Sequence, residues 1–429
     1  MKNKFWGLGR DFWLFRTGQL ISSIGDGCAD IAFMWWLLEK TGSAEKMALI
    51  FAPVSFVRIF LIPLFGPAGD RYCRKKVAII SDAWRGVMFL TLAALVKLDV
   101  FNLPLVTALF MFTTAGTALF ATVSGSIVAQ LVKKEELSAA IERSNFVVAV
   151  GNLSGGLIGG IAINYFGVTG AFLINSVSFF IATAASCYIR TRSSAAVVPP
   201  QPPGEALKVW AVQLKEGFSV VARIPMQLWL CVLLAFINLA VSPLSLALPV
   251  LVKDSGALSP GFIGILNAAL ETGTILGSLV VGWLCRKIFT DKVIFAGIGL
   301  IGAGMAALFL VPGAYSVIAI MLMLGMAMML VNVPLSVKLM AATPDNYRSR
   351  VSSVSAFMSQ AAVPVGMAFS GFIIAGYGMQ FMMIAAGAGV ILSAPLLFLV
   401  PQFSAFFRMP EPDTHEYFLK KHPKAFCKA

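Results

Sequence analysis

Three carboxylic acids lie inside apolar stretches long enough to cross a membrane. Asp26 and Asp30 share the first stretch, and Glu271 lies in a later one. An ionisable side chain at the centre of a bilayer costs roughly 2.5–3.5 kcal/mol, so it normally faces a cavity or a partner. Two carboxylates one helical turn apart cannot both ionise cheaply at low dielectric. Asp26 and Asp30 are therefore candidates for carrying a proton.

Arg58 offers a second interpretation, because it lies midway along the second apolar stretch. It is expected to pair with Asp30 or Asp26 and to exchange that partner for a proton or a cationic ligand. Glu271 has no base nearby in its own stretch, which makes it the best single candidate for reversible protonation or for meeting a cationic drug. The structural alternative is a static buried ion pair that holds helices together, since such pairs also perturb titration.

The polar residues around these acids recur at helical spacing. In the first stretch Arg16, Gln19, Ser23, Asp26 and Asp30 fall on one face of one helix. A similar face in a later stretch carries Asn267, Glu271, Thr274 and Ser278. One acid-bearing face from each half of the chain is expected to line a shared cavity. In contrast, Asp82 and Arg85 are expected to form a structural pair near one end of their helix.

The composition decides what kind of elements position these residues. Of 429 residues, 58% are hydrophobic and only 12% charged, whereas a soluble domain carries about 25% charged residues. The net charge of +13 would indicate nucleic acid in a soluble protein, but in so apolar a chain it indicates basic loops on one side of a membrane. We therefore expect an all-α polytopic membrane protein with membrane lipid around it and no nucleic acid partner.

The sequence contains no motif for binding a metal, a cofactor or a nucleotide. The six cysteines are scattered singly, and the two histidines, His415 and His422, lie near the C-terminus. No GxxxxGK[ST] motif occurs. The expected protein is not an enzyme and has no metal and no cofactor, and an ion gradient supplies its energy.

A scan for apolar stretches of about 20 residues predicts twelve spans. The predicted ranges are 12–38, 47–66, 77–97, 104–128, 144–166, 168–189, 227–251, 260–284, 292–311, 315–337, 350–375 and 380–400. A proline-rich segment divides them six and six. The predicted parts are an N-terminal half at 1–189, a linker at 190–226, a C-terminal half at 227–400 and a tail at 401–429. The tail is expected to be a solvated cytoplasmic extension with a short segment at the membrane surface.

Basic residues predict the orientation. With the N-terminus inside, the outer loops hold only Lys40, Lys46, Lys97 and Lys253, while most other Lys and Arg residues fall in inner segments. This asymmetry fits the positive-inside rule. Both termini and the linker are therefore expected on the cytoplasmic side of a bacterial inner membrane.

The segment after the second span is repeated in weaker form after the eighth. Gly66–Val77 reads GPAGDRYCRKKV, and Gly282–Val293 reads GWLCRKIFTDKV. The first copy resembles the signature of the major facilitator superfamily, with Cys73 in place of its second glycine. The resemblance implies twelve helices in two six-helix halves that alternate in access. It also implies a gating loop, formed by Gly66, Asp70, Arg71 and Arg74.

Further stretches resemble the drug-exporter branch that includes macrolide efflux proteins. They include the pair Gly18-Gln19, residues 38–44, residues 134–137 and residues 348–351. The fifth span resembles the antiporter motif of drug–proton exchangers, although Gly156 stands where that motif has proline. Close helix packing through small residues explains its glycines equally well. Those glycines are Gly151, Gly155, Gly156, Gly159 and Gly160.

The resemblance implies proton-coupled export of hydrophobic small molecules, drugs or siderophores, by a monomer. Gln19, Ser22, Gly25 and Asp26 are also similar to lysophospholipid transporters of the same superfamily. A lysophospholipid flippase is therefore the alternative. A receptor or scaffold on the same fold is a third interpretation.

Overall fold

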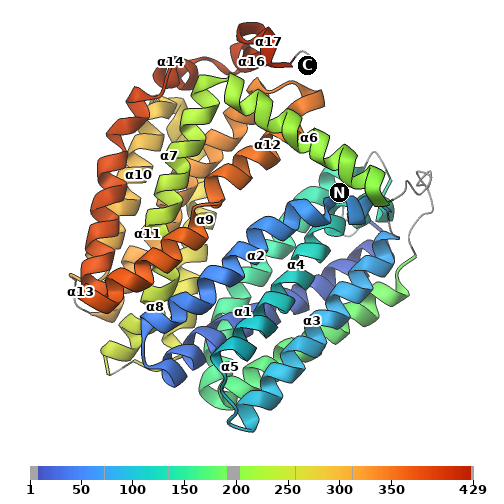
Figure 1. Cartoon of the computed structure of the whole chain (residues 1–429), viewed down its shortest axis with the longest axis vertical. Helices are drawn as coiled ribbons and strands as arrows, with labels where there is room; N and C mark the ends of the chain where they lie inside the picture. Colours follow the sequence, from blue (N-terminus) through green and yellow to red (C-terminus); the bar gives the residue numbers. More distant parts are fainter. Residues whose placement is uncertain are drawn as a thin grey trace, which may run out of the picture. The chain divides into compact units, whose positions relative to one another are not determined.

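The computed structural model describes residues 8–71, 73–133, 136–190, 203–256, 258–311 and 313–426. Within these ranges the regular secondary structure is entirely helical (Figure 1). The helices before the linker are α1 (Arg10–Thr41), α2 (Ala44–Arg71), α3 (Arg74–Lys97), α4 (Leu103–Leu131) and α5 (Leu137–Tyr188). Local signals explain their ends: Gly42 ends α1 in the left-handed conformation, and the Asn102 side chain accepts a bond from the amide of Leu105 at the start of α4.

The remaining helices form the second part of the chain. They are α6 (Pro203–Arg223), α7 (Pro225–Val241), α8 (Leu244–Asp254), α9 (Phe262–Lys287), α10 (Thr290–Ala307), α11 (Ala314–Ala342), α12 (Asp345–Gln360) and α13 (Val363–Ser393). Five short elements follow: η2 (Pro395–Leu399), α14 (Phe403–Arg408), α15 (Glu411–Thr414), α16 (Tyr417–Lys421) and α17 (Pro423–Phe426). Helix α6 lies within the segment interpreted from sequence as a linker.

Eight of the described helical stretches have the length and composition to cross a membrane. Two of them are long enough to cross twice. Helix α5 is interrupted at Gly167 and α13 at Gly378, where φ is 65° and 82°. Glycine adopts positive φ without a steric penalty, so each turn needs no loop. With α1 and α2, which carry Asp26, Asp30 and Arg58, the described residues contain the predicted twelve spans.

Two predicted spans are broken where the sequence scan made them continuous. The seventh is divided into α7 and α8 at Ser242 and Pro243, and the eleventh into α12 and the start of α13 just before Pro364. Proline has no N–H group and its ring clashes with the preceding turn. A hydropathy scan does not register these breaks, because the flanking residues are equally apolar.

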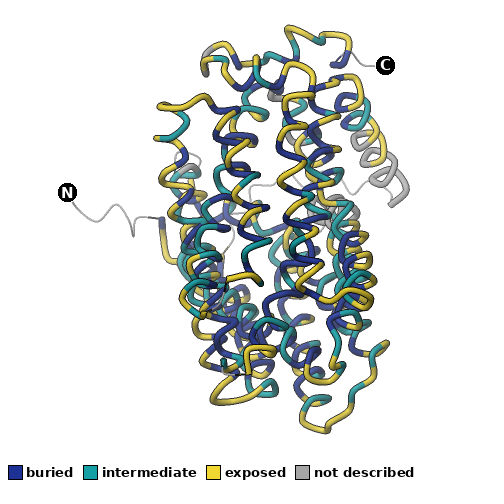
Figure 2. Tube along the Cα trace, turned by 90° about the vertical axis from the view of Figure 1, so that its left-hand side faces the viewer, coloured by how far each residue is buried: buried dark blue, intermediate teal, exposed yellow. Residues whose placement is uncertain are grey.

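The helices divide into two compact units. Unit 1 comprises residues 1–206 with 249–268, and unit 2 comprises residues 207–248 with 269–429. Along the helices of both units, buried and exposed residues alternate on a short repeat, as expected of helices that bury one face (Figure 2).

Glycines allow α1 to pack closely against both segments of α5. A Cβ atom added at Gly159 would lie 2.8 Å from the Cα of Cys28, and one added at Gly18 would lie 2.9 Å from the Cβ of Ala185. On the other face of α5, a Cβ at Gly156 would lie 3.3 Å from the backbone oxygen of Gly264 in α9. Close backbone approach is therefore one established use of this glycine series.

The end of the chain folds back onto unit 2, so the prediction of a solvated tail is wrong. Four phenylalanines of the tail are buried at 1% exposure or less: Phe403, Phe406, Phe407 and Phe418. Arg408 forms an ion pair of 2.8 Å with Asp291 at the start of α10, whose side chain is fully buried. This hydrogen-bonded carboxylate raises the pKa of Arg408, so the guanidinium stays charged.

Backbone acceptors complete the attachment of the tail. Lys338 of α11 donates to the carbonyls of Phe407 and Met409, at 2.6 and 2.8 Å. The hydroxyl of Tyr347 at the start of α12 donates to the carbonyl of Phe426 at 2.9 Å. Apolar burial was missed from sequence because the tail alternates aromatic and charged residues, without a long apolar run.

Substituting Gly159 tests the close packing of α1 and α5. Gly159→Leu is expected to destabilise the purified protein by about 1–3 kcal/mol, since its side chain would overlap Cys28. Gly125→Leu is the matched control, because no heavy atom lies within 4 Å of a Cβ built there. The melting temperature in detergent reports the stability of both variants. Equal melting temperatures would contradict the close packing of α1 and α5.

Substituting Arg408 tests the attachment of the tail. Arg408→Ala leaves the buried carboxylate of Asp291 without its cation, so the melting temperature is expected to fall by several degrees. Lys420→Ala removes an exposed tail cation as a control. Adding Asp291→Asn to Arg408→Ala is expected to restore part of the loss, and no restoration would show that the ion pair is not the cause.

Candidate functional site

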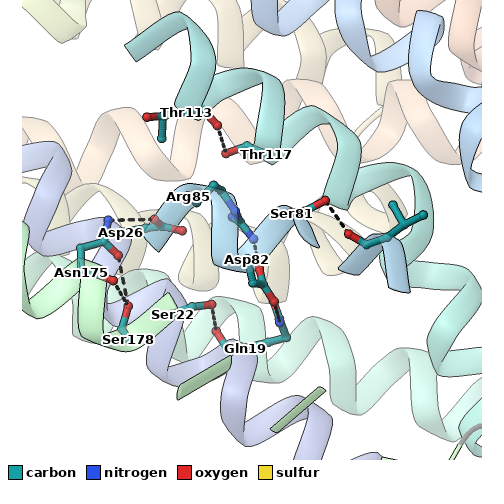
Figure 3. Close-up of polar contacts among 11 residues, drawn as sticks. Gln19, Ser22, Asp26, Ser81, Asp82, Arg85, Thr113, Thr117, Asn175 and Ser178 are labelled. Atoms are coloured by element: carbon teal, nitrogen blue, oxygen red, sulfur yellow. Dashed lines mark hydrogen bonds and ion pairs between the residues drawn. The ribbon is translucent and has the colours of Figure 1, made fainter. Parts of the chain in front are cut away.

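A buried polar cluster joins α1, α3 and α5 inside unit 1 (Figure 3). Asp82 and Arg85, one turn apart on α3, form an ion pair and are 0% and 4% exposed. Gln19 of α1 donates its amide to the other oxygen of Asp82 at 3.4 Å. The guanidinium also lies over the rings of Phe179 and Phe120, at 4.2 and 4.9 Å. Arg85 is thus held by a carboxylate and two aromatic faces.

Asp26 belongs to the same region but has a neutral partner. The Asn175 side chain donates to Asp26 at 3.3 Å, and the Ser178 hydroxyl donates to Asn175 at 3.1 Å (Figure 3). The fields of Arg85, Asp30 and Asp82 reach Asp26, but no ion pair of the described residues includes it. Asp26 therefore retains an oxygen that can bind a proton.

The sequence predicted the pairing of Asp82 and Arg85 but not the further contacts that this pair makes. The two residues do pair as expected, and they also bond to Gln19 of the first span and stack on Phe179 of the sixth. Asn175 and Ser178 were missed. Their signal was two polar residues three positions apart in an apolar span, which is weak without knowledge of what they face.

Asp30 and Arg58 are both exposed side chains in the middle of membrane-spanning helices. The positive charge of Arg58 acts on Asp30, and the carboxylates of Asp30 and Asp26 repel each other. The expected ion pair is not formed here, since the ion pairs of the described residues include neither side chain. Exposure of charge to lipid is costly, so both groups require water or a polar partner.

Glu271 and Asn267 lie one turn apart on α9 but fall in different compact units. The Thr274 hydroxyl donates to the backbone carbonyl of Glu271 at 2.8 Å and to its carboxylate at 3.4 Å. No ion pair of the described residues involves Glu271. Asn267 packs near Gly156 of α5: a Cβ atom added at Gly156 would lie 3.5 Å from the Cβ of Asn267.

The predicted gating loop is only partly visible. Gly66, Asp70 and Arg71 form the end of α2, and their side-chain environment lies outside the described residues. Arg74 is the first residue of α3. The neighbouring Lys75 donates to the carbonyls of Cys187 and Ile189 at 2.8 and 2.9 Å, which fastens the start of α3 to the end of α5.

Unit 2 contains a groove of about 580 Å³ between α7, α11 and α12. We call it the unit 2 groove. Four amide side chains line it, together with hydroxyls from α11 and α12, and most of the remaining lining is apolar. The amides are Gln227, Asn238, Asn332 and Gln360. Its volume falls in the range of small-molecule sites. The sequence marks Asn238 as part of a polar face of the seventh span, with Ser242 and Ser245, but it does not single out the other three amides because amides in apolar helices carry no motif.

The model of the Major Facilitator Superfamily matches residues 17–365 and 228–425. The chain belongs to this superfamily. Macrolide efflux protein A of Streptococcus pyogenes is 20% identical over 389 residues, which cover 89% of this chain and 93% of that protein. Multidrug efflux pump Tap of Mycolicibacterium fortuitum is 23% identical over 397 residues, which cover 90% and 93%.

Solved structures agree on the fold. The crystal structure of nucleoside transporter NupG aligns with a TM-score of 0.76 at 11% identity and covers 91% of this chain and 100% of that chain. This superfamily member is therefore a multi-pass membrane transporter and not an enzyme, and its similarity to drug exporters confirms the resemblance found in the sequence.

Substituting Arg85 tests the buried pair. Arg85→Leu leaves Asp82 without a cation and is expected to cost about 3–5 kcal/mol. The double variant Asp82→Asn with Arg85→Leu removes both charges and should recover much of that stability. Breaking the exposed pair of Lys40 and Asp99 with Lys40→Ala is the control, and it should cost under about 1 kcal/mol. Thermal unfolding measures all three, and a loss for Arg85→Leu no larger than the control would contradict a buried pair.

Proposed function

We propose that this transporter exports hydrophobic or amphiphilic small molecules, such as drugs or siderophores, from a bacterial cytoplasm in exchange for protons. Relatives that align over nine tenths of the chain include a macrolide efflux protein and a multidrug efflux pump. They support efflux as the direction of transport. The proposal places the protein in the inner membrane with both termini in the cytoplasm, as the basic residues predict.

The main support for proton coupling is that the acids within the spans differ in the kind of partner they have. Asp82 is paired with Arg85. Asp26 has an amide partner and Glu271 has a hydroxyl partner. Among the described residues Asp30 has no hydrogen bond and no ion pair, although the charge of Arg58 acts on it. A carboxylate bound to a cation has little need of a proton, whereas one with a neutral partner can be neutralised only by taking one.

This division assigns roles to the groups. Asp82 and Arg85 hold α3 against α1 and α5, and Arg85 is committed to that pair. Asp26, Asp30 and Glu271 bind and release protons as access alternates. A single charge moving through about 100 mV supplies about 2.3 kcal/mol, which is enough to drive useful accumulation.

The segment that joins α2 to α3 is proposed as the gate. Gly66, Asp70 and Arg71 at the end of α2 and Arg74 at the start of α3 supply it, as in the superfamily signature. Lys75 supports this role because its bonds to the carbonyls at the end of α5 give the start of α3 a fixed attachment. Movement of the gate would then be confined to the end of α2.

Inside-out vesicles test the proton roles. Asp26→Asn, Asp30→Asn and Glu271→Gln are each expected to lose substrate accumulation driven by a pH gradient, because the neutral side chain cannot bind and release a proton. Exchange of labelled for unlabelled substrate needs no net proton movement and should persist. Asp99→Asn is the control, since Asp99 is exposed outside the spans. Full gradient-driven accumulation in all three acid variants would show that these roles are wrong.

The same strain distinguishes the lipid alternative. Lysophospholipid uptake by spheroplasts, measured beside dye efflux, reports whether the substrate is a lipid. Uptake without efflux would replace drug export by lipid transport as the function.

A further inference from the structure

The unit 2 groove contains amide groups whose hydrogen-bonding capacity is not used. Asn332 of α11 and Gln360 of α12 are exposed side chains lining the groove, and no hydrogen bond to them occurs among the described residues. Gln227 of α7 donates to the hydroxyl of Ser355 at 2.9 Å, but its Oε1 atom is buried without a partner. Polar groups left unpaired in a membrane domain are costly, so these amides require water or a ligand.

The charge of the groove is as informative as its amides. Among its described lining residues Arg348 is the one charged side chain, and none is acidic. The Nε atom of Arg348 already donates to the carbonyl of Met340 at 3.0 Å. A cationic compound would therefore find no counterion in the groove. The membrane acids Asp26, Asp30 and Glu271 do not line it.

The rest of the lining is mostly hydrocarbon. Leu230, Leu234 and Ile237 of α7 and Val331 and Leu335 of α11 belong to it, interleaved with the amides along the same helices. Met328 adds a flexible, polarisable side chain that adapts to varied shapes. The groove thus combines apolar contact with amides that offer both donors and acceptors.

We propose that the unit 2 groove binds neutral amphiphiles, compounds that combine hydroxyl and carbonyl groups with a hydrocarbon body. This inference rests on the export function proposed above and names the substrate class. Asn332 and Gln360 recognise the polar groups of the substrate. In this arrangement the membrane acids bind protons, and the amides of the groove recognise the substrate.

Binding to the purified full-length protein tests the inference without a gradient. The probes are chloramphenicol and prednisolone as neutral compounds, tetraphenylphosphonium as a cation and lauroyl lysophosphatidic acid as an anionic lipid. The neutral probes are expected to bind and to raise the melting temperature. Asn332→Leu and Gln360→Leu should each weaken their binding by about tenfold, since a hydroxyl or carbonyl of the probe loses its partner. Asn346→Leu, an exposed amide outside the groove, is the matched control.

A variant that gains affinity for a new ligand must be folded, so it separates a specific effect from misfolding. Asn332→Asp places a carboxylate in the groove, so it should gain affinity for tetraphenylphosphonium while losing affinity for the neutral probes. Binding of the cation by the unmodified protein in preference to the neutral probes would overturn the inference. So would preference for the anionic lipid with dependence on Arg348, or binding of no probe at all.

The vesicle assay keeps the two proposals separate. Amide-dependent binding of neutral probes without gradient-driven export would contradict the proposed function and leave the ligand class standing. Gradient-driven export of a cation that ignores Asn332 and Gln360 would support the function and overturn the ligand class.

Discussion

The low polarity of the membrane interior constrains every charged side chain in this protein. A carboxylate there needs a cation, a proton or water, and each choice has a different consequence. Arg85 satisfies Asp82 and is held in turn by two aromatic rings. Because Arg85 is already engaged, Asp26 is left with the amide of Asn175. One ion pair thereby leaves the neighbouring acid with a neutral partner.

Helix packing makes this arrangement possible. Glycines let the backbone of α1 approach both segments of α5, so Asp26 comes within reach of Asn175 although the two are far apart in sequence. Bulkier residues would move α1 away and lengthen that hydrogen bond. The glycine series is thus a structural requirement of the polar cluster, whatever part it also takes in alternating access. The attached tail has a comparable role in unit 2, where it joins the ends of α10, α11 and α12.

The polar groups of the two units differ in kind. Unit 1 holds a charged cluster with aromatic walls, whereas the groove of unit 2 is lined by amides, hydroxyls and hydrocarbon. Amides form bonds of moderate strength with neutral partners and do not require a counterion. A division between proton binding by acids and substrate binding by amides would let one coupling mechanism serve substrates of varied structure.

The sequence by itself determined the twelve spans and the class of the protein, because apolar length and scarce charge are properties of composition. It also identified Asp26, Asp30 and Glu271, since an acid in an apolar stretch is conspicuous. Only the tertiary structure decided the partners of the buried polar groups: it joined Gln19 to Asp82 and Asn175 to Asp26, and it formed no ion pair with Arg58 among the described residues. It also placed the amides of the groove and buried the tail, because partners distant in sequence are set by how helices pack, and periodicity along one helix does not encode that.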